Sequence, residues 1–306
     1  MGAYLARRAL YSLLTLLVVI SAVFFLLRLA PGGPFDGERQ LPPEIEANLN
    51  AAYHLDAPLY EQYLRYLSDL LRGDMGPSLT QKDFSVAELI TSGLPTSLAL
   101  GAGALVTALC LGLAIGTYCG RRTGTLIDGA LMSLTNVTLA IPAIVSGPVL
   151  ILVFAISLSW LPSGGSGSAA HLLLPIVALA LPYIAAIARL IRGSVAEVGG
   201  EPFVITAQSK GIGEARILWR HIMPGAAIPL VSFLGPAAAG LLTGSVVVEQ
   251  IFDLPGIGRY FVQAALNRDY TLVMGVAVVY AAAILTFNLL VDLTYGVLDP
   301  RIRVRQ

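Results

Sequence analysis

The sequence is poor in charged residues, and this deficit excludes an ordinary soluble domain. Only 12% of its 306 residues are Asp, Glu, Lys or Arg, whereas about 25% is usual in soluble globular proteins. Hydrophobic residues make up 56% of the chain, a composition typical of integral membrane proteins. The 19 basic and 19 acidic residues balance, so bulk charge indicates no particular partner, and we expect no nucleic acid to bind.

Cysteine is also scarce, which argues against a disulfide framework or a metal cluster. The two cysteines, Cys110 and Cys119, lie nine positions apart in one apolar run. On a helix this separation places them on opposite faces, so we expect no disulfide between them. We expect no metal site either, because no group of Cys, His, Asp and Glu residues has the spacing of metal ligands.

The sequence lacks the motifs of a nucleotide-binding or hydrolytic enzyme. It contains no Gly-x-x-x-x-Gly-Lys-Ser/Thr phosphate loop, and "GIGEAR" and "PGIGRY" lack the third glycine of a dinucleotide-binding fingerprint. No Ser, His and Asp set indicates a catalytic triad, so we assign no catalytic role to His54, His171 or His221. We therefore expect no enzymatic activity and no bound cofactor in this chain.

Long apolar runs are abundant instead, and they predict a membrane-spanning helical bundle. A run of about 18 or more mostly apolar residues is long enough to cross the bilayer as a helix. The third run contains Pro142 and Pro148, which predict a kink or a break. The expected fold class is an all-α membrane protein with six transmembrane helices. The six runs are Ala9–Leu27, Leu94–Cys119, Gly129–Leu158, Ala169–Ala188, Gly225–Val248 and Thr271–Val291.

The basic residues predict which loops face the cytoplasm, because short cytoplasmic loops are enriched in Lys and Arg. Placing the N-terminus inside leaves only Arg259 and Arg268 in the short outer loops. We therefore predict a multi-pass protein with both termini in the cytoplasm. The basic residues that then lie in cytoplasmic segments are Arg7, Arg8, Arg121, Arg122, Arg189, Arg192, Lys210, Arg216, Arg220, Arg301, Arg303 and Arg305.

The chain divides into three predicted parts. Residues 1–30 form an N-terminal tail and the first transmembrane helix, which is too long for the apolar part of a typical signal peptide. Residues 31–93 form a long outer loop, in which we expect two short helices, at Pro43–Ala51 and Leu59–Leu71. We favour a cap on the bundle as the role of this loop, with a docking surface for an outer partner as the alternative. Residues 94–306 form a five-helix core.

A charged, glycine-interrupted loop at residues 189–224 lies between two apolar runs of the core. Glu201 and Pro202 predict a helix start, because proline is favoured at the first helical position. Gly211 predicts the end of that helix. A helix of about nine residues is marginal in isolation, so it needs a surface to lie against. That surface is either a groove in another protein or the lipid headgroups.

The same loop has further expected features. Phe203, Val204 and Ala207 are expected to share one face of the short helix. A second helical piece is expected to run through Ala215–Ile222 and to end at Pro224. The loop is therefore predicted as a short helix, a glycine elbow and another helix.

Small residues recur at helical spacing in two of the predicted transmembrane helices. They fall every four residues, which allows the backbones of neighbouring helices to approach closely. We favour static packing within the chain as their role, with a sliding interface as the alternative. These residues are Gly112, Gly116 and Gly120 in the second run, and Gly240 and Gly244 in the fifth.

The interior of the predicted bundle holds almost no charge. Asn136 and Asn288 are the main strongly polar candidates there, whereas Asp128, Glu249 and Asp292 lie near helix ends. An ion-coupled carrier usually needs ionisable groups at membrane depth. The pattern therefore favours an uncharged pathway over ion coupling.

Several stretches resemble one protein family. Ile205-Thr206-Ala207, three residues, Gly211 and then Pro224 follow the spacing of the cytoplasmic loop signature of ABC importer permeases, although that signature begins with Glu-Ala. The wider stretch "RGSVAEVGGEPFVITAQSKGIGEARILWRHIMPGAAIP" is similar to the peptide-importer branch, as are "RLAPGGPFDGERQLPPE", "YHLDAPLYEQYLRYL", "VEQIFDLPGIGRYFVQAALNRDYT" and "DPRIR". The resemblance spans essentially the whole chain, and the short link "WLPSGGSGSAAH" is more similar to oligopeptide than to dipeptide permeases.

This resemblance implies a type I ABC importer permease fold and a role as one membrane-spanning subunit of a peptide importer in a bacterial inner membrane. The implied partners are a second homologous permease, two cytoplasmic ATPase subunits that bind ATP and Mg²⁺, an extracytoplasmic peptide-binding protein and the peptide itself. In that family a short cytoplasmic helix sits in a groove of the ATPase. The implied ATPase-coupling residues here are Glu201, Pro202, Phe203, Thr206, Ala207, Lys210 and Gly211.

Other residues are candidates for the pathway or for an outer gate. The last outer loop either forms part of a gate or is a re-entrant turn that seals the bundle. Permeases of the same branch for nickel chelates or glutathione are alternatives, and an ion-coupled carrier or a membrane scaffold without a conduction role is less favoured. The candidate residues are Asn136, Asn288, Glu249, Asp253 and Asp269.

Overall fold

The computed structural model describes residues 2–30, 33, 55–81 and 83–298, and within these ranges the chain consists of helices joined by turns and loops, with one isolated bridge between Pro77 and Ser85. The predicted helix at Pro43–Ala51 lies outside the described residues. The helices are α1 (Gly2–Leu29), α3 (Leu59–Leu71), α4 (Val86–Arg121), α5 (Leu126–Ala140), α6 (Ala143–Leu150), η1 (Ile151–Ser157), α7 (Ala170–Gly199), α8 (Pro202–Ser209), α9 (Glu214–Ile217), η2 (Leu218–Ile222), α10 (Met223–Ala226), α11 (Ile228–Ile251), α12 (Ile257–Leu266) and α13 (Tyr270–Leu298).

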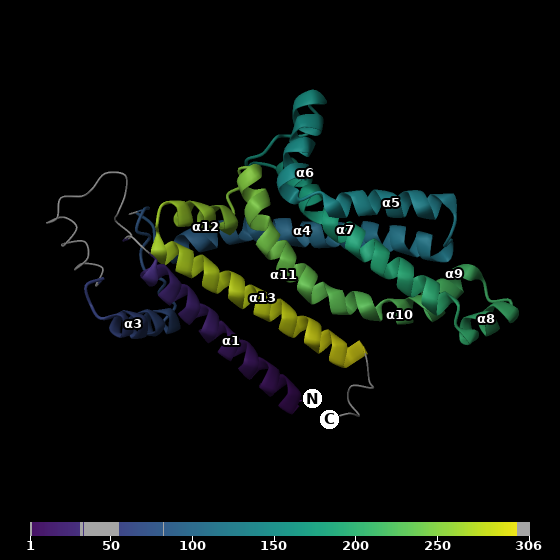
Figure 1. Cartoon of the computed structure of the whole chain (residues 1–306), viewed down its shortest axis with the longest axis horizontal. Helices are drawn as coiled ribbons and strands as arrows, with labels where there is room; N and C mark the ends of the chain where they lie inside the picture. The colour runs from purple at the N-terminus through teal and green to yellow at the C-terminus, as the bar shows by residue number, and fades with distance from the viewer. Residues whose placement is uncertain (1, 31–32, 34–54, 82, 299–306) are drawn as a thin grey trace.

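Five of these helices are long and apolar enough to cross a membrane, and the number is six if one bent pair is counted as a single broken span rather than as a re-entrant loop. The five are α1, α4, α7, α11 and α13. In the bent pair, α5 and the α6–η1 segment meet at 105°, and Figure 1 shows α6 projecting from the bundle. The break falls at Ile141 and Pro142, which have extended backbone conformations, because the residue before a proline avoids the helical region. The predicted break in the third run is confirmed.

The tightest packing joins α4 to α7, and the glycines predicted to permit close approach carry it. A Cβ atom on Gly116 would lie 2.6 Å from the carbonyl oxygen of Ala188, and one on Gly120 would lie 2.9 Å from that of Arg192. No side chain larger than hydrogen fits there without moving backbone. Gly240 and Gly244 on α11 likewise face Tyr183 and Leu179 of α7. The prediction that these faces pack within the chain is confirmed.

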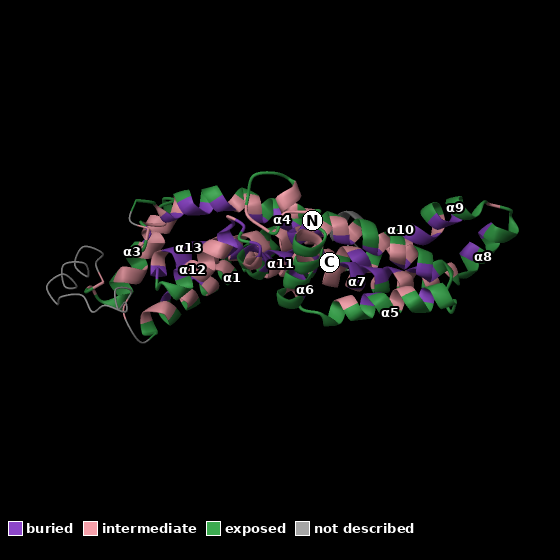
Figure 2. Ribbon diagram, turned by 90° about the horizontal axis from the view of Figure 1, so that it is seen from above, coloured by how far each residue is buried: buried purple, intermediate pink, exposed green. Residues whose placement is uncertain are grey.

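The elements lie along one long axis, with two distinct ends. Figure 1 shows α8 and α9 at one end, called here the α8 end, and α3 and α12 at the other, called the α12 end. Figure 2 shows the buried residues concentrated where α4, α7 and α11 pack together, whereas α5 and α6 are largely exposed. Much of α1 is exposed as well. These exposed apolar surfaces suit contact with lipid or with a further membrane protein.

The helix predicted at Leu59–Leu71 is confirmed as α3, and it packs against α1. The rings of Tyr63 and Tyr66 lie 5.3 Å and 5.8 Å from the ring of Phe24, which is fully buried. The guanidinium of Arg28 lies 5.2 Å from the same ring. No residue of α3 is itself fully buried, so this helix covers the end of α1 while keeping an exposed face.

One local prediction is wrong, and one helix was not predicted. The second helical piece of the 189–224 loop does not end at Pro224, because that proline occupies the first turn of α10, where no backbone donor is required. The chain therefore continues as helix into α11. The last outer loop, for which a gate or a re-entrant turn is expected, contains the ten-residue helix α12, which was not predicted from the sequence. Its glycines and proline mark only the tight turn that precedes this helix.

Candidate functional site

The short helix α8 is built by the residues that predicted it. Glu201 is its N-cap, with an extended backbone, and Pro202 follows at the first helical position. At the other end Gly211 has a φ of +72°, a conformation that costs glycine little and other residues more. The N–H of Gly211 donates to the carbonyl of Gln208 at 2.9 Å and that of Ile212 to Ala207 at 3.3 Å. These bonds close the helix and turn the chain toward α9.

The inner face of α8 attaches it to the rest of the chain. Val204 is fully buried and Ala207 is nearly so, and both belong to the same hydrophobic cluster as Ile217 and Ile222. The expectation that Phe203 shares this face is wrong. Half of its surface is exposed, because it lies one position, or about 100°, around the helix from Val204. Ala207 therefore packs α8 against the rest of the chain and is not exposed to a partner.

Two large apolar side chains of α8 are exposed, one on each side of the buried Val204. Phe203 is 50% exposed and Ile205 is 53% exposed. Ile205 was not among the predicted coupling residues, although a large apolar residue in a short helix of a charged loop is a signal in the sequence. The remaining predicted coupling residues are also exposed, and they are Glu201, Pro202, Thr206, Lys210 and Gly211.

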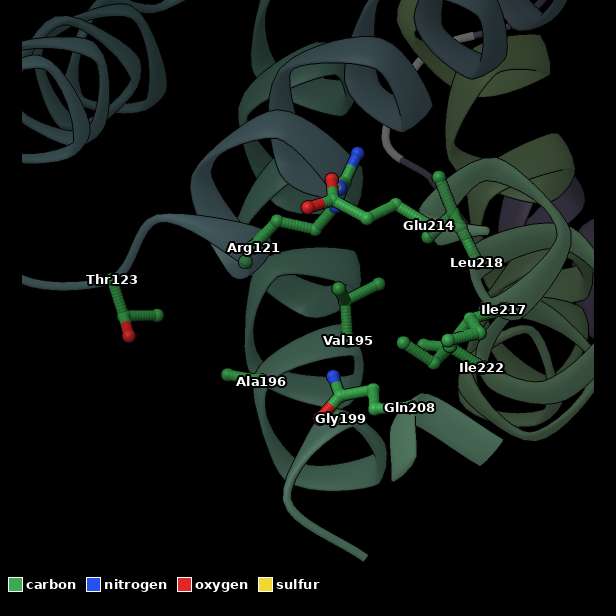
Figure 3. A pocket seen from close by; sticks show the side chains of 11 residues that line it. Arg121, Thr123, Val195, Ala196, Gly199, Gln208, Glu214, Ile217, Leu218 and Ile222 are labelled. Carbon is green, nitrogen blue, oxygen red and sulfur yellow. Dashed lines mark hydrogen bonds and ion pairs between the residues drawn. The ribbon is translucent and has the colours of Figure 1, made fainter. Parts of the chain in front are cut away.

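A cleft of about 310 Å³ separates α8 and α9 from the ends of α4 and α7. Figure 3 shows Arg121 and Glu214 side by side at one edge of this cleft and Gln208 at the opposite edge. Arg121 and Glu214 form an ion pair that links the end of α4 to the start of α9. The cleft is lined by Gly120, Arg121, Thr123, Val195, Ala196, Gly199, Gln208, Glu214, Ile217, Leu218 and Ile222.

A second ion pair fixes the start of α5 to α7 at the same end. Both nitrogens of the Arg192 fork bind the carboxylate of Asp128, at 2.6 Å and 2.8 Å. Asp128 is buried and also accepts a hydrogen bond from the N–H of Gly124 at 2.9 Å. The sequence identified both charges near helix ends but gave no sign of their pairing, since they lie 64 residues apart.

At the α12 end, Asp269 joins three segments. One carboxylate oxygen accepts from the backbone N–H and the hydroxyl of Thr80, at 3.2 Å and 2.8 Å, and from the hydroxyl of Ser78. The other oxygen accepts from Leu272 at 3.1 Å and Thr271 at 2.9 Å, in the first turn of α13. Burial works to raise the pKa of this carboxyl, but the hydrogen bonds from Ser78, Leu272 and Thr80 outweigh it and hold the pKa below its usual range. Asp269 therefore caps α13 and fastens the end of the first loop to it.

Glu249 occupies a different position near the same end. It lies in the last turn of α11, is fully buried and accepts hydrogen bonds from the N–H groups of Gly258 at 2.8 Å and Arg259 at 3.2 Å. Ser97 of α4 accepts from the adjacent N–H of Ile257 at 2.9 Å. Helix N-termini leave such donors unpaired, so the first turn of α12 is satisfied by side chains from two other helices.

The remaining pathway or gate candidates are dispersed. Asp253 is exposed, has a φ of +52° and pairs with Arg259 at 2.9 Å. Asn136 lies on the exposed surface of α5. Asn288 is half-buried on α13, where its oxygen faces Gly235 of α11. In the described part of the chain, no three His, Cys, Asp or Glu side chains are grouped so that they could hold a metal ion.

Comparison with known proteins gives one consistent result. A profile of the family described as "Binding-protein-dependent transport system inner membrane component" matches residues 112–304. The chain is 45% identical to the oligopeptide transport system permease protein OppB of Haemophilus influenzae and 46% identical to that of Escherichia coli K12, over 98% of this chain and 99% of each relative. It is 38% identical to the dipeptide transport system permease protein DppB of Bacillus subtilis, over 100% of this chain and 99% of the relative.

A solved structure shares the fold. It is described as an amino acid ABC transporter with histidines, and it aligns with a TM-score of 0.53 at 23% identity, covering 68% of this chain and 93% of its own. This chain belongs to the family of inner membrane components of binding-protein-dependent transport systems.

Proposed function

We propose that this chain is a permease subunit of an ATP-driven importer of peptides, with oligopeptides as the favoured substrates. The observation that carries the proposal is the similarity to oligopeptide permeases, at 45–46% identity over 98% of the chain. Relatives of this similarity along their whole length share the pathway-forming helices as well as the loops. A carrier for ions is not favoured, because the charged residues found buried in the described spans lie near their ends.

The α8 end is proposed to face the cytoplasm. The short loops and helix ends at the α8 end carry Arg121, Arg122, Arg192, Lys210, Arg216 and Arg220, whereas the last loop at the α12 end carries only Arg259 and Arg268. Arg65 and Arg72, also at the α12 end, belong to the long first loop, to which the charge rule applies poorly. Cytoplasmic loops are enriched in Lys and Arg, and this orientation puts the N-terminus inside, with the C-terminus expected inside as well. The α12 end then faces the binding protein that delivers peptide.

In this orientation α8 is the element that binds an ATPase subunit. Its inner face is fixed by Val204 and Ala207, so a force on the exposed side chains of Phe203 and Ile205 moves the bundle rather than the helix alone. The elbow at Gly211 passes the displacement to α9. ATP and Mg²⁺ are expected in the partner ATPase subunits, which supply the energy of transport.

A second permease subunit is proposed to complete the pathway. The exposed apolar surfaces of α5 and α6 offer a face for a second membrane protein as well as for lipid. Asn136 lies on α5, where a pathway between two permeases would place it against peptide. Hydrogen-bonding groups without charge suit a substrate whose side chains vary.

Purification of the complex tests this proposal. We expect this chain to co-purify with a second permease and two ATPase subunits. We expect ATP hydrolysis in proteoliposomes to rise when peptide-loaded binding protein is added. Glutathione and a nickel chelate serve as competing solutes in parallel uptake assays. Transport of either solute in preference to peptides, or ATP-independent uptake driven by an ion gradient, would refute the proposed function.

A further inference from the structure

The first turn of α12 is held by two helices at once, and this arrangement is the basis of the inference. The N–H of Ile257 donates to Ser97 of α4, while the next two, of Gly258 and Arg259, donate to Glu249 of α11. All three bonds lie within one turn. If α11 moves relative to α4, both sets of bonds cannot keep their geometry.

Gly256 and Gly258 allow the backbone at the start of α12 to approach the Glu249 carboxylate closely. A Cβ atom on Gly256 would overlap the Glu249 carboxylate, and one on Gly258 would lie 2.8 Å from it and 2.6 Å from the Cα of Val246. The hydroxyls of Ser97 and Ser245 also approach the same carboxyl. The close approach is thus built into the chain, and Glu249 holds α12 more firmly than Ser97 does because it accepts two of the three bonds.

Glu249 also lies at the far end of a continuous helical segment that begins beside α8. The segment comprises α9, η2, α10 and α11, residues 214–251, and is called here the α9–α11 rod. The residues at its internal joints, Ile217, Ile222 and Ala227, all have helical backbone angles. The N–H of Ala227 donates to Met223 at 2.9 Å and that of Val231 to Ala227 at 3.0 Å, so the ladder continues across the last joint. Figure 1 shows this rod crossing the molecule from the α8 end toward α12.

The site contains spare hydrogen-bonding capacity that rigid packing does not explain. The second oxygen of Glu249 and the hydroxyl of Tyr280 on α13 are buried, and neither has a hydrogen-bond partner in the described part of the chain. The Tyr280 hydroxyl lies near Gly258, on the same side as the Glu249 oxygen that accepts the backbone bonds: a Cβ atom on Gly258 would lie 3.0 Å from the hydroxyl and 2.8 Å from that oxygen. Unpaired buried polar atoms are costly and call for an explanation. The hydroxyls of Ser97 and Ser245, which approach the same carboxyl, are available as alternative donors when the backbone bonds change.

We infer that Glu249 is the positioning residue through which movement of the α9–α11 rod displaces α12, so that a displacement beginning at α8 reaches the opposite end of the protein. During this movement α12 follows α11 and releases Ser97. The inference rests on the proposed function, since that function supplies the movement at α8. It adds a defined link between the ATPase end and the outer end that faces the binding protein.

A distance measurement in the assembled importer tests the inference. One spin label is placed on α12 at Ala265→Cys and one on α4 at Leu111→Cys, both on exposed surfaces. Cys110 and Cys119 are replaced by alanine in this background. The α4–α12 distance is compared in the nucleotide-free complex and in the complex trapped with ATP and vanadate. We expect trapping to change this distance in the native background.

Variants of Glu249 and Ser97 show whether Glu249 transmits the movement to α12 or only stabilises the fold. Glu249→Leu removes the acceptor, and we expect the distance change to fall by at least half. Glu249→Gln keeps an acceptor oxygen and is expected to preserve most of the change. Ser97→Ala removes only the α4 bond and is expected to leave the change intact or to enlarge it.

Several outcomes overturn the inference. These are an unchanged response in Glu249→Leu, a reduced response in Ser97→Ala, or no response in a native background that transports peptide. If Glu249→Leu does not accumulate in the membrane, the Ser97→Ala comparison decides alone, because a rigid junction predicts a loss there. Failure of peptide-stimulated hydrolysis in the labelled background would instead contradict the proposed function, so the two failures are distinguishable.

Discussion

Single residues determine the two ends of this protein in different ways. At the α8 end a glycine is required for its backbone angle, since Gly211 has a φ of +72° and open space around it. At the α12 end a carboxylate is required for its acceptor oxygens, since Asp269 fastens two loop segments to a helix start. Predictions at this scale therefore concern conformation in the first case and hydrogen bonding in the second.

Replacing Gly211 with valine is expected to uncouple ATP hydrolysis from peptide uptake. A left-handed backbone costs an L-residue about 1–2 kcal/mol, and a β-branched side chain makes it worse. This cost corresponds to roughly a 5- to 30-fold decrease in the ratio of molecules with the native backbone conformation at position 211 to those without it. Uptake per ATP hydrolysed, measured in proteoliposomes, should fall accordingly. Gly213→Ala is the matched control, because Gly213 has a φ of −62° and also lies in open space. Equal uptake in the two variants would contradict the prediction.

Replacing Asp269 with asparagine is expected to lower stability in a pH-dependent manner. The pKa of this carboxyl is lower in the folded protein than its ordinary value of 3.8. Its contribution to stability is therefore present above the unfolded pKa and is lost as the pH falls through the folded pKa. The difference in melting temperature between native protein and D269N, measured in detergent, should be largest above about pH 5 and shrink as the pH falls below 4.

A matched change at an exposed carboxylate controls for the loss of charge alone. Asp253→Asn alters a side chain that is mostly exposed, in an ion pair at the surface, where such pairs contribute about 0–1 kcal/mol. It should lower the melting temperature little at any pH. If D269N and the native protein have the same melting temperature at neutral pH, the hydrogen bonds of Asp269 do not stabilise the fold.

At the scale of elements, the α4–α7 pair is the rigid part on which the others are mounted. Its backbones approach so closely that a Cβ atom at Gly116 would lie 2.6 Å from a carbonyl oxygen. The expected effect of Gly116→Ala is a loss of stability of about 1–3 kcal/mol, because the helices must separate. Gly101→Ala on the same helix meets nothing within 4 Å and should be neutral or stabilising by up to about 1 kcal/mol. Thermal melting of the two variants in detergent measures this contrast.

The element α8 gives a prediction about partner binding. Replacing Phe203 and Ile205 together by serine removes two half-exposed apolar side chains that flank its buried stripe. If each buries its exposed part against the ATPase, the loss is about 2–3 kcal/mol, or roughly 30- to 150-fold in affinity. Titration of purified ATPase onto the permease pair measures this loss. Ser209→Ala, on an exposed polar residue of the same helix, is the control and should bind normally.

The sequence predicted those elements whose signals are local. Pro202 and Gly211 marked the ends of α8, and Pro142 marked the break between α5 and α6, because each of these residues restricts its own backbone. It did not predict which way Phe203 faces, since that depends on the surface against which α8 packs. The helix α12 was missed because glycine and proline dominate the turn before it, although Ile257, Phe261 and Ala264 recur at helical spacing.

Long-range pairings were also beyond the sequence. The packing of helices far apart in the chain brings together Asp128 and Arg192. It also brings Asp269 to Thr80. Asp269 was considered as a gate residue from its place in an outer loop. The structure gives it hydrogen bonds within the fold, and Glu249 is the only other candidate of that group that is fully buried.

At the scale of the whole molecule, the chain is a bundle whose two ends carry different tasks. The α8 end offers an apolar, exposed helix mounted on a rigid core, and the α12 end offers a capped assembly of short helices. The α9–α11 rod runs between them. The central proposal is that a motor subunit acts on α8 from the cytoplasm and that the bundle converts this movement into passage of a peptide.

The most direct measurement of that proposal is photo-crosslinking from α8 in the native membrane. A photoreactive amino acid is placed at Ile205, whose side chain is exposed on α8. In a second variant it is placed at Leu134, which is exposed on α5. We predict that position 205 crosslinks to an ATPase subunit and that the yield changes when ATP is trapped with vanadate, whereas position 134 does not reach that subunit. Crosslinking of position 205 to lipid alone, in a membrane that imports peptide, would contradict the proposal.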